Sequence, residues 1–568
     1  MIGHQGTRTG MYAAIFGAIL AMAAFHAPLA FARPEQRTRT GPPMAQTPPR
    51  PMPPVNAIAI ASDQLTNRCP DTLKPAPANS SSWAGWSPTP ANWRFQPEKE
   101  AGIPASSVPS LKLKWAFGIP NVKIVRSQPA VYAGRVYVGG NDGTLYALDA
   151  KTGCTLWATK ASKSVRSGIA VAKAGSTEAV FFGDAGGDVY ALDANSGAFL
   201  WSAHPEDHPA ATITGTPTYY NGRLYVPMSS GEEQFRRRPG YECCTFRGSL
   251  TALDAASGRV IWKTYMSPET PSPQGKAPNG TMTMGPSGMA IWSSPTIDVA
   301  EHRIYVGTGD NYAPPDTATA DSVVALDMDS GKILWQTQFT KPKMDAIVCG
   351  EPPRPGCEPP HVPEFDLGAS PVLVKLHTGK RVLILGQKTG VVYAVDPDHD
   401  GKLLWFDRAG VGGLLGGVQW GMATNGQRVF VAVSDLAFQG RGPDPTKGGG
   451  ISAYRVDDGK LLWHTPPPGC GDRRPCSPAQ SQAISAIPGA VFSGSIDGHL
   501  RAYAASDGKI IWDFDTARSF DTVNKIEAKG GSLDVGGPVI AGGMVFVVSG
   551  YPGFGAMPGN VLLAFSTE

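Results

Sequence analysis

The chain has 568 residues, of which 42% are hydrophobic and 17% charged, so it is long enough for one large domain or several ordinary ones. Its 50 Lys and Arg against 47 Asp and Glu leave a formal net charge of +3, which argues against a nucleic-acid-binding surface. The 68 Gly and 52 Pro predict many turns and therefore short elements.

The first part of the chain has the pattern of an export signal. Residues 11–30 form an apolar run, and Ala30 and Ala32 give the A-x-A arrangement of a cleavage site. We therefore expect residues 1–32 to be a signal peptide and the mature protein to be periplasmic or secreted, without spanning a membrane. An uncleaved membrane anchor is the alternative.

A Pro-rich stretch follows the signal. Residues 33–80 include GPPMAQTPPRPMPP, a composition that offers no packed core, so we expect a disordered linker there. Residues 81–568 are expected to form one large domain.

Export permits disulfides, and the chain has eight cysteines. Two close pairs lie in Pro-rich loops and predict two loop staples, and two further cysteines make the set even without fixing their connectivity. The close pairs are Cys349 with Cys357 and Cys470 with Cys476, and the two further cysteines are Cys69 and Cys154.

Cys243 and Cys244 are direct neighbours in YECCTFRG, residues 241–248. Adjacent Cα atoms lie about 3.8 Å apart, whereas an ordinary disulfide needs about 4.4–6.8 Å. A bond between these two cysteines would close a tight, strained ring, and strain of that kind is often found at functional sites. Two free or separately bridged thiols are the alternative.

A repeat of the form ALD-x-x-[ST]-G-x-x-x-W runs along the chain. Each copy reads as a strand, an Asp/Ser/Gly turn and a second strand ending in Trp, and the run before it, such as 127–140, reads as another hairpin. One unit is therefore four short antiparallel strands, the size of a propeller blade. The copies are 139–157, 183–201, 246–262, 321–335, 389–405, 449–463 and 497–512.

The last unit of the chain has only three strands, and LKLKWAF at 111–117 can supply the fourth. We therefore predict an all-β fold, an eight-bladed β-propeller of four-stranded antiparallel blades closed by an N-terminal strand. Closure of this kind removes exposed sheet edges.

Strand topology places every long loop on one face of such a ring. If the strands of a blade are a to d from axis to rim, b–c and d–a loops share a face, and insertions gathered on one face indicate the binding side. The long b–c loops are 228–247, 310–322, 434–450 and 549–560, and the long d–a loops are 266–291, 340–366 and 465–480.

Charged and aromatic residues gather where these loops meet the inner strands. Acids from three consecutive blades predict a hard-cation site that prefers Ca²⁺ over Mg²⁺, and the bases suit an anionic ligand. Taken singly, each charge could be a solvated surface residue and each Trp a core residue. The residues are Arg126, Arg166, Trp292, Asp366 and Trp420 at d–a junctions, and Glu232, Glu233, Asp310, Asn311 and Lys388 in b–c loops.

With these motifs the chain resembles the pyrroloquinoline quinone (PQQ) dependent alcohol dehydrogenases, a family of eight-bladed quinoproteins. Within it the motifs are most similar to those of polyvinyl alcohol dehydrogenases, from about residue 83 to the end. The most specific are YECCTFRGSLTALDAASG at 241–258, YVGTGDNY at 305–312 and DLGASPVL at 366–373. The repeat alone is shared with non-enzymatic propellers.

The resemblance implies a role for each site residue. Asp366 would be the catalytic base, and Lys388 would stand beside the reactive carbonyls of PQQ. Trp292 would be the floor on which the quinone stacks, Gln419 and Trp420 would line the other side of the pocket, and Arg166 would contact the cofactor carboxylates. Ca²⁺ would be held by Glu233 (Glu232 being the less favoured choice), Asp310 and Asp366.

The resemblance also predicts a Cys243–Cys244 disulfide near the quinone, although methanol-type relatives carry this ring one blade earlier. Polyvinyl alcohol dehydrogenases typically have a cytochrome domain where this chain has its Pro-rich stretch. Because the chain has no C-x-x-C-H haem motif, we expect a separate periplasmic cytochrome c to accept the electrons. The expected substrate is a secondary alcohol or polyol. The alternatives are a non-catalytic outer-membrane assembly scaffold and a quinoprotein for sugars or primary alcohols.

Overall fold

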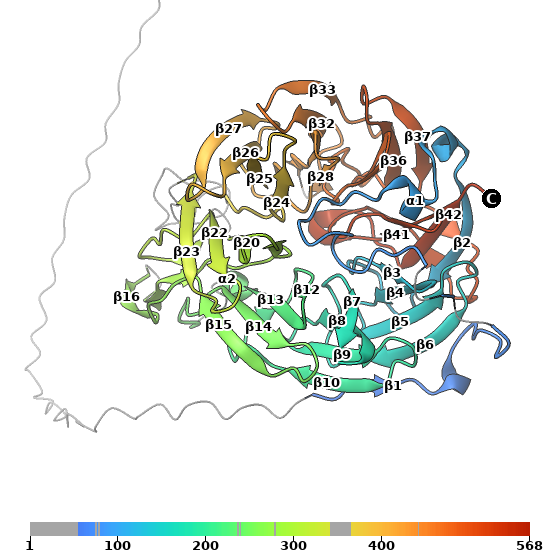
Figure 1. Ribbon diagram of the computed structural model, residues 1–568, viewed down its shortest axis with the longest axis horizontal. Helices are drawn as coiled ribbons and strands as arrows, with labels where there is room; N and C mark the ends of the chain where they lie inside the picture. Colours follow the sequence, from blue (N-terminus) through green and yellow to red (C-terminus); the bar gives the residue numbers. More distant parts are fainter. Residues whose placement is uncertain are drawn as a thin grey trace, which may run out of the picture. The chain divides into compact units, whose positions relative to one another are not determined.

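The structure is a computed structural model that describes residues 55–568 except 74, 75, 78, 79, 236, 237, 239, 278, 279, 341–364 and 441. Within these residues, eight blades of four antiparallel strands follow one another around a central axis (Figure 1). The predicted eight-bladed propeller is therefore confirmed. The expected signal peptide, residues 1–32, and residues 33–54 of the expected linker lie outside the described residues.

The strands of each blade run in order from the axis to the rim. Blades 1 to 4 are β3–β6 (Ala130–Tyr132, Arg135–Gly139, Thr144–Asp149, Thr155–Lys160), β7–β10 (Ala170–Ala174, Thr177–Gly183, Val189–Asp193, Phe199–Ala203), β12–β15 (Thr218–Tyr220, Arg223–Ser230, Ser249–Asp254, Val260–Tyr265) and β19, β20, β22, β23 (Thr296–Asp298, Arg303–Gly307, Ser322–Asp327, Ile333–Gln338). Blades 5 to 8 are β24–β27 (Val372–Lys375, Arg381–Gly386, Val391–Asp396, Lys402–Arg408), β28, β29, β32, β33 (Ala423–Thr424, Arg428–Val433, Gly450–Arg455, Leu461–Thr465), β34–β37 (Ser485–Ile487, Ala490–Gly494, His499–Ala504, Ile510–Asp515) and β40, β41, β42, β2 (Val539–Ala541, Met544–Ser549, Val561–Ser566, Lys112–Gly118).

Shorter elements lie outside the blades. They are β1 (Ile58–Ala59), β11 (Ala211–Thr212), β16 (Ser272–Lys276), β17 (Met282–Gly285), β18 (Ser287–Gly288), β21 (Asn311–Ala313), β30 (Phe438–Gln439), β31 (Gly442–Pro443), β38 (Ser519–Phe520), β39 (Ala528–Lys529), the α-helices α1 (Glu98–Ala101) and α2 (Glu232–Phe235), and the 3-10 turns η1 (Ser62–Gln64), η2 (Ala105–Ser110) and η3 (Gly553–Gly555).

The ring closes through β2, as the sequence predicts. β2 pairs with β42 from Lys112↔Ser566 to Gly118↔Val561, so the first and last strands of the ring belong to one blade. The indole of Trp512, in the preceding blade, donates to the carbonyl of Leu111 at 3.0 Å. Closure therefore uses both the backbone ladder and an inter-blade hydrogen bond.

The tryptophan of the repeat joins each blade to the next. Trp157 on the rim strand of blade 1 donates to the carbonyl of Ala194 in blade 2 at 3.1 Å, and its ring covers Gly197. A Cβ on Gly197 would lie 2.5 Å from that ring, and the residue has φ +71°, so the turn requires glycine for two reasons. Trp201 makes the same contacts with Ala255 and Gly258.

The segment before β2 packs across the inner strands. Trp83 pairs with Val131 of blade 1, and Phe95 pairs with Ala486 of blade 7. Arg94 is fully buried and donates to the carbonyls of Ile484 and Trp86, and burial lowers its pKa to about 9. This segment therefore covers one end of the central channel.

The described part of the expected linker is attached to blade 1. β1 pairs with β6, and Cys69 is bonded to Cys154. This differs from the disordered linker expected there, because edge pairing and the disulfide hold a stretch that has no core of its own. Cys470–Cys476 is bonded as predicted, whereas the 349/357 pair lies outside the described residues. Among the described helices, none is long and apolar enough to cross a bilayer.

Candidate active site

A cavity of about 480 Å³ opens on the face that carries the long loops. All eight d–a junctions contribute residues to it, so the cavity lies on the face where the long loops gather. The junction residues are Arg126, Arg166, Thr212, Thr214, Trp292, Asp366, Gln419, Trp420, Ser481 and Asp534, and b–c loops add Glu233, Asp310, Lys388, Leu436, Tyr551 and Phe554.

Asp366 is the centre of the cavity's polar network. Its Oδ2 accepts a hydrogen bond from the indole Nε1 of Trp292 at 3.0 Å and lies 3.0 Å from Nζ of Lys388. Its Oδ1 accepts from the backbone N–H of Asp310 at 3.1 Å. The Asp366 and Lys388 side chains are only 8% and 9% exposed, so little water screens this ion pair.

Local structure fixes the two partners of Asp366. Lys388 lies in the tight turn between β25 and β26, and its backbone N–H donates to the carbonyl of Asp366 at 3.0 Å. Asp310 precedes β21, which pairs with β18, and the carbonyl of Asp310 accepts from the N–H of Met289 at 2.7 Å. The loops thus hold both residues through the backbone.

Two tryptophans form the aromatic part of the cavity. The rings of Trp292 and Trp420 meet edge to face with centroids 4.9 Å apart. Trp292 lies over Gly368, where a Cβ would come within 1.8 Å of its ring, so only glycine fits beneath it. Nζ of Lys388 lies 5.3 Å from the centroid of the Trp292 ring. The structure therefore brings the predicted floor and the predicted catalytic pair together.

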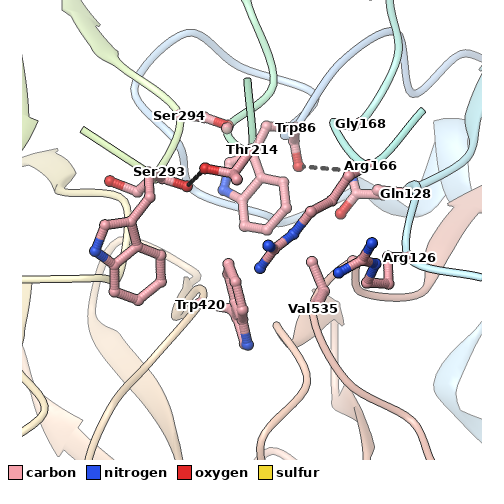
Figure 2. A pocket seen from close by; sticks show the side chains of 13 residues that line it. Trp86, Arg126, Gln128, Arg166, Gly168, Thr214, Ser293, Ser294, Trp420 and Val535 are labelled. Carbon is pink, nitrogen blue, oxygen red and sulfur yellow. Dashed lines mark hydrogen bonds between the residues drawn. The ribbon is translucent and has the colours of Figure 1, made fainter. Parts of the chain in front are cut away.

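Two arginines point into the same space beside Trp420 (Figure 2). The guanidinium of Arg166 lies 5.7 Å from the Trp420 ring centroid, and Arg126 donates to Asn141 at 3.0 Å. Within the described residues, the buried Nε of each arginine has no hydrogen-bond partner. Burial and the charge of Arg166 lower the pKa of Arg126 to about 10. Buried donors without acceptors fit a ligand that carries carboxylates.

Asp534 is the acid at this basic end. Its Oδ1 accepts from the indole of Trp420 at 2.7 Å and from the hydroxyl of Ser481 at 2.8 Å. Burial raises the pKa of Asp534 above its usual value, although these hydrogen bonds and Arg166 oppose the shift. Asp534 thus orients Trp420 toward the cavity.

The structure separates the two neighbouring glutamates. Glu233 lines the cavity together with Asp310 and Asp366. Glu232 is fully buried and accepts from the backbone N–H groups of Thr245 and Phe246. Burial alone would raise the pKa of Glu232, but hydrogen bonds from His208 and Phe246 outweigh it and hold the pKa below its usual range. Glu232 therefore anchors the CCTF segment, and Glu233 is the one that faces the cavity.

Cys243 and Cys244 are bonded to each other, as predicted. Their side chains are not among the residues that line the described cavity. They are 4% and 0% exposed and belong to a packed cluster that includes Tyr312, a lining residue, and Trp292 at its edge. The structure thus places the disulfide behind the cavity wall, and its contact with a cofactor stays a prediction.

Other residues that line the cavity were not predicted from the sequence. Asp534 stands in LDVGGPV five residues before its inner strand, and Asp366 stands in FDLGASPV six residues before its own, so an alignment of the junctions with one gap would have found it. Leu436, Tyr551 and Phe554 carry no such signal, because they lie in loops of unique sequence.

Comparison with known proteins supports a relation to quinoproteins. A family profile described as "Glucose/ethanol/alcohol dehydrogenase, beta-propeller domain" matches residues 83–345. A second, described as "Outer membrane protein assembly factor BamB", matches 246–469 and 447–568. Both profiles cover the repeat.

Curated relatives and solved structures extend these matches. The chain is 42% identical to a polyvinylalcohol dehydrogenase of Pseudomonas sp over 86% of this chain and 77% of that protein. It is 39% identical to one of Sphingopyxis sp. over 86% and 76%. A quinohemoprotein alcohol dehydrogenase of Pseudomonas putida has the same fold, with TM-score 0.63, 19% identity, and 86% of this chain and 80% of that chain covered.

Proposed function

The chain belongs to the PQQ-dependent alcohol dehydrogenase family, and we propose that it is a periplasmic, calcium-assisted member that oxidises secondary alcohols or polyols like polyvinyl alcohol. The observation that carries this proposal is the Asp366–Lys388–Trp292 constellation within one cavity. The two relatives above, named as polyvinylalcohol dehydrogenases, support the choice of substrate.

The residues present fit PQQ. When bound, the cofactor supplies a quinone carbonyl that accepts hydride from the alcohol carbon. Trp292 offers a flat face, and Gln419 and Trp420 line the adjoining wall. The unpartnered Nε atoms of Arg126 and Arg166 would pair with carboxylates of the cofactor.

In this proposal Asp366 takes the proton of the alcohol. Its two oxygens accept hydrogen bonds from the Asp310 backbone and from Trp292, which hold the carboxylate in one orientation. Nζ of Lys388 lies 3.0 Å from Oδ2 of Asp366 and is close enough to stabilise negative charge that develops on a neighbouring oxygen. Side chains less than a tenth exposed keep water from competing for the proton.

Calcium is the metal that the donor set favours. Glu233, Asp310 and Asp366 supply carboxylate oxygens to one cavity, and hard cations prefer such ligands. Several carboxylates in one buried site repel one another, and a divalent cation would relieve that repulsion. Electrons would leave through a separate cytochrome c, because the sequence has no C-x-x-C-H motif.

The assembly-scaffold alternative draws on the second family profile. That profile covers the shared repeat, and a scaffold has no need for a buried Asp366–Lys388 pair in the same cavity as two arginines whose buried Nε atoms lack partners among the described residues. The cavity therefore favours the enzyme.

Reconstitution tests the proposal. Purified apoprotein is supplied with PQQ, Ca²⁺ or both, and reduction of an artificial electron acceptor is followed with polyvinyl alcohol, 2-butanol and glucose. We expect turnover that requires both additions and that favours the first two substrates. If the protein binds no PQQ in excess Ca²⁺, as measured by its visible absorbance, the proposed enzymatic function is refuted and the assembly-scaffold function is favoured instead.

A further inference from the structure

The walls of the cavity differ in polarity. One wall, here called the polar wall, consists of Thr212, Ser229, Ser230 and Gln234 from blade 3 and the loop that leads into it. The other, here called the apolar wall, consists of Leu414, Leu415, Leu436 and Phe554. In a ring of eight, blade 7 faces blade 3 across the axis, and the loops that carry Leu436 and Phe554 belong to the flanking blades 6 and 8. The two walls therefore stand on opposite sides of the cavity opening, here called the mouth.

Each wall is held in place by its own structure. β11 pairs with β13 through Ala211↔Ser230 and Thr212↔Ser229, which fixes the polar wall to the edge of blade 3. Leu436 packs against a buried cluster of Ala479, Ile496 and Ala556.

Phe554 is the most telling member of the apolar wall. It is 49% exposed although it is a large aromatic residue, and it packs against Phe438, itself 46% exposed, with centroids 6.4 Å apart. Its φ is +55°, a conformation that a bulky residue rarely adopts and that marks functional sites. A half-exposed ring held in this conformation leads to the hypothesis that Phe554 contacts a ligand.

We propose that the two walls together form a binding groove for a chain-like polyol, with methylene groups against the apolar wall and hydroxyl groups against the polar wall. This inference rests on the proposed function, because the same cavity contains Asp366. A polymer with hydroxyls on alternate carbons has both surfaces along its length. A short alcohol reaches Asp366 without filling the groove.

The test compares Phe554→Asn with Phe406→Asn in the reconstituted enzyme. Asn tolerates a positive φ, so the loop keeps its conformation. Phe406 is 64% exposed on the rim strand β27, away from the cavity, and serves as the matched control. We expect Phe554→Asn to raise the KM for polyvinyl alcohol about tenfold through the lost ring contact and to leave kcat and the KM for 2-butanol within twofold. Phe554→Trp, which keeps a large aromatic ring at this position, should have a KM for polyvinyl alcohol close to that of wild type.

If both Asn variants have the same KM for polyvinyl alcohol, the proposed binding groove is refuted, whereas the proposed dehydrogenase function is not affected. A slower reaction with a c-type cytochrome at unchanged polymer KM would assign the wall to acceptor docking and also overturn it. If wild type oxidises neither alcohol, the proposed function fails, and calorimetric titration of the apoprotein with polyvinyl alcohol decides the groove separately. Tenfold weaker binding to Phe554→Asn than to wild type supports it, and equal or absent binding refutes it.

Discussion

The rim and the mouth of the propeller use the same repeat for different ends. At the rim, Trp157 and Trp201 each cover a glycine of the next blade and donate to a carbonyl there, so one contact recurs around the ring. On the face with the long loops, the d–a junctions do not share one residue type but present arginines, tryptophans and acids, among them Arg166, Trp292 and Asp366. The repeated rim contacts specify the fold. The d–a junctions make no such repeated contact, and their residues can therefore serve the active site.

The largest effect should come from the mouth. Asp366→Asn keeps the shape of the side chain but removes the base, so we expect turnover of the reconstituted enzyme to fall about 10³-fold. The variant should stay folded at the assay temperature, although its thermal midpoint should fall because Lys388 loses a buried ion-pair partner. Asp457→Asn, on an exposed rim turn, is the control and should keep full activity. Wild-type turnover in Asp366→Asn would disprove the proposed base.

At the rim the converse is expected. Trp201→Ala should lower the free energy of unfolding by about 3–5 kcal/mol, since it removes a buried indole that covers Gly258. Activity per folded molecule should stay near that of wild type. Denaturant titration of Trp201→Ala beside Leu200→Ala, whose side chain is 37% exposed, checks this. If both variants lose a similar free energy of unfolding, the contact between the Trp201 indole and Gly258 does not contribute the expected stability.

A smaller effect should separate cofactor binding from catalysis. Arg166→Met removes a guanidinium whose buried Nε has no hydrogen-bond partner within the described residues, so the Kd for PQQ should rise about 10- to 100-fold, as expected for a charge-assisted hydrogen bond. The kcat at saturating PQQ should change much less. Absorbance titration of the apoprotein measures the Kd, with Arg259→Met on an exposed turn as control. An unchanged Kd would mean that the basic end binds something else.

The rim was predictable from the sequence because its contacts repeat. Seven copies ending in Trp and one three-stranded last unit predict eight blades, and that last unit requires a strand such as 111–117. The cavity residues could be predicted for the same reason, since topology brings the d–a junctions and the b–c loops of all blades to one face. Asp366, Lys388, Trp292 and Glu233 accordingly share a cavity.

What could not be predicted depends on loop conformation. Phe554 reaches the mouth through a positive φ in a loop without a repeat, and the disulfide of Cys243 and Cys244 lies behind the wall because Glu232 anchors the segment that follows it. Such placements follow from packing between distant blades, and no local pattern in the sequence reports them.

The smallest effect concerns a rim carboxylate. Asp513 accepts from His499 and pairs with Arg501; burial would raise the pKa of Asp513, but these partners hold it below its usual value. A depressed pKa stabilises the fold above the unfolded-state value, about 3.9, and this contribution is lost as pH falls through the folded-state value. Asp513→Asn should therefore cost less than about 1 kcal/mol at pH 6 and progressively less toward pH 3. Denaturant midpoints of both proteins across that range measure it, and a gap that widens on acidification would contradict the sign. Turnover should be unaffected at every pH where the fold is intact, since no rim charge lines the cavity among the described residues.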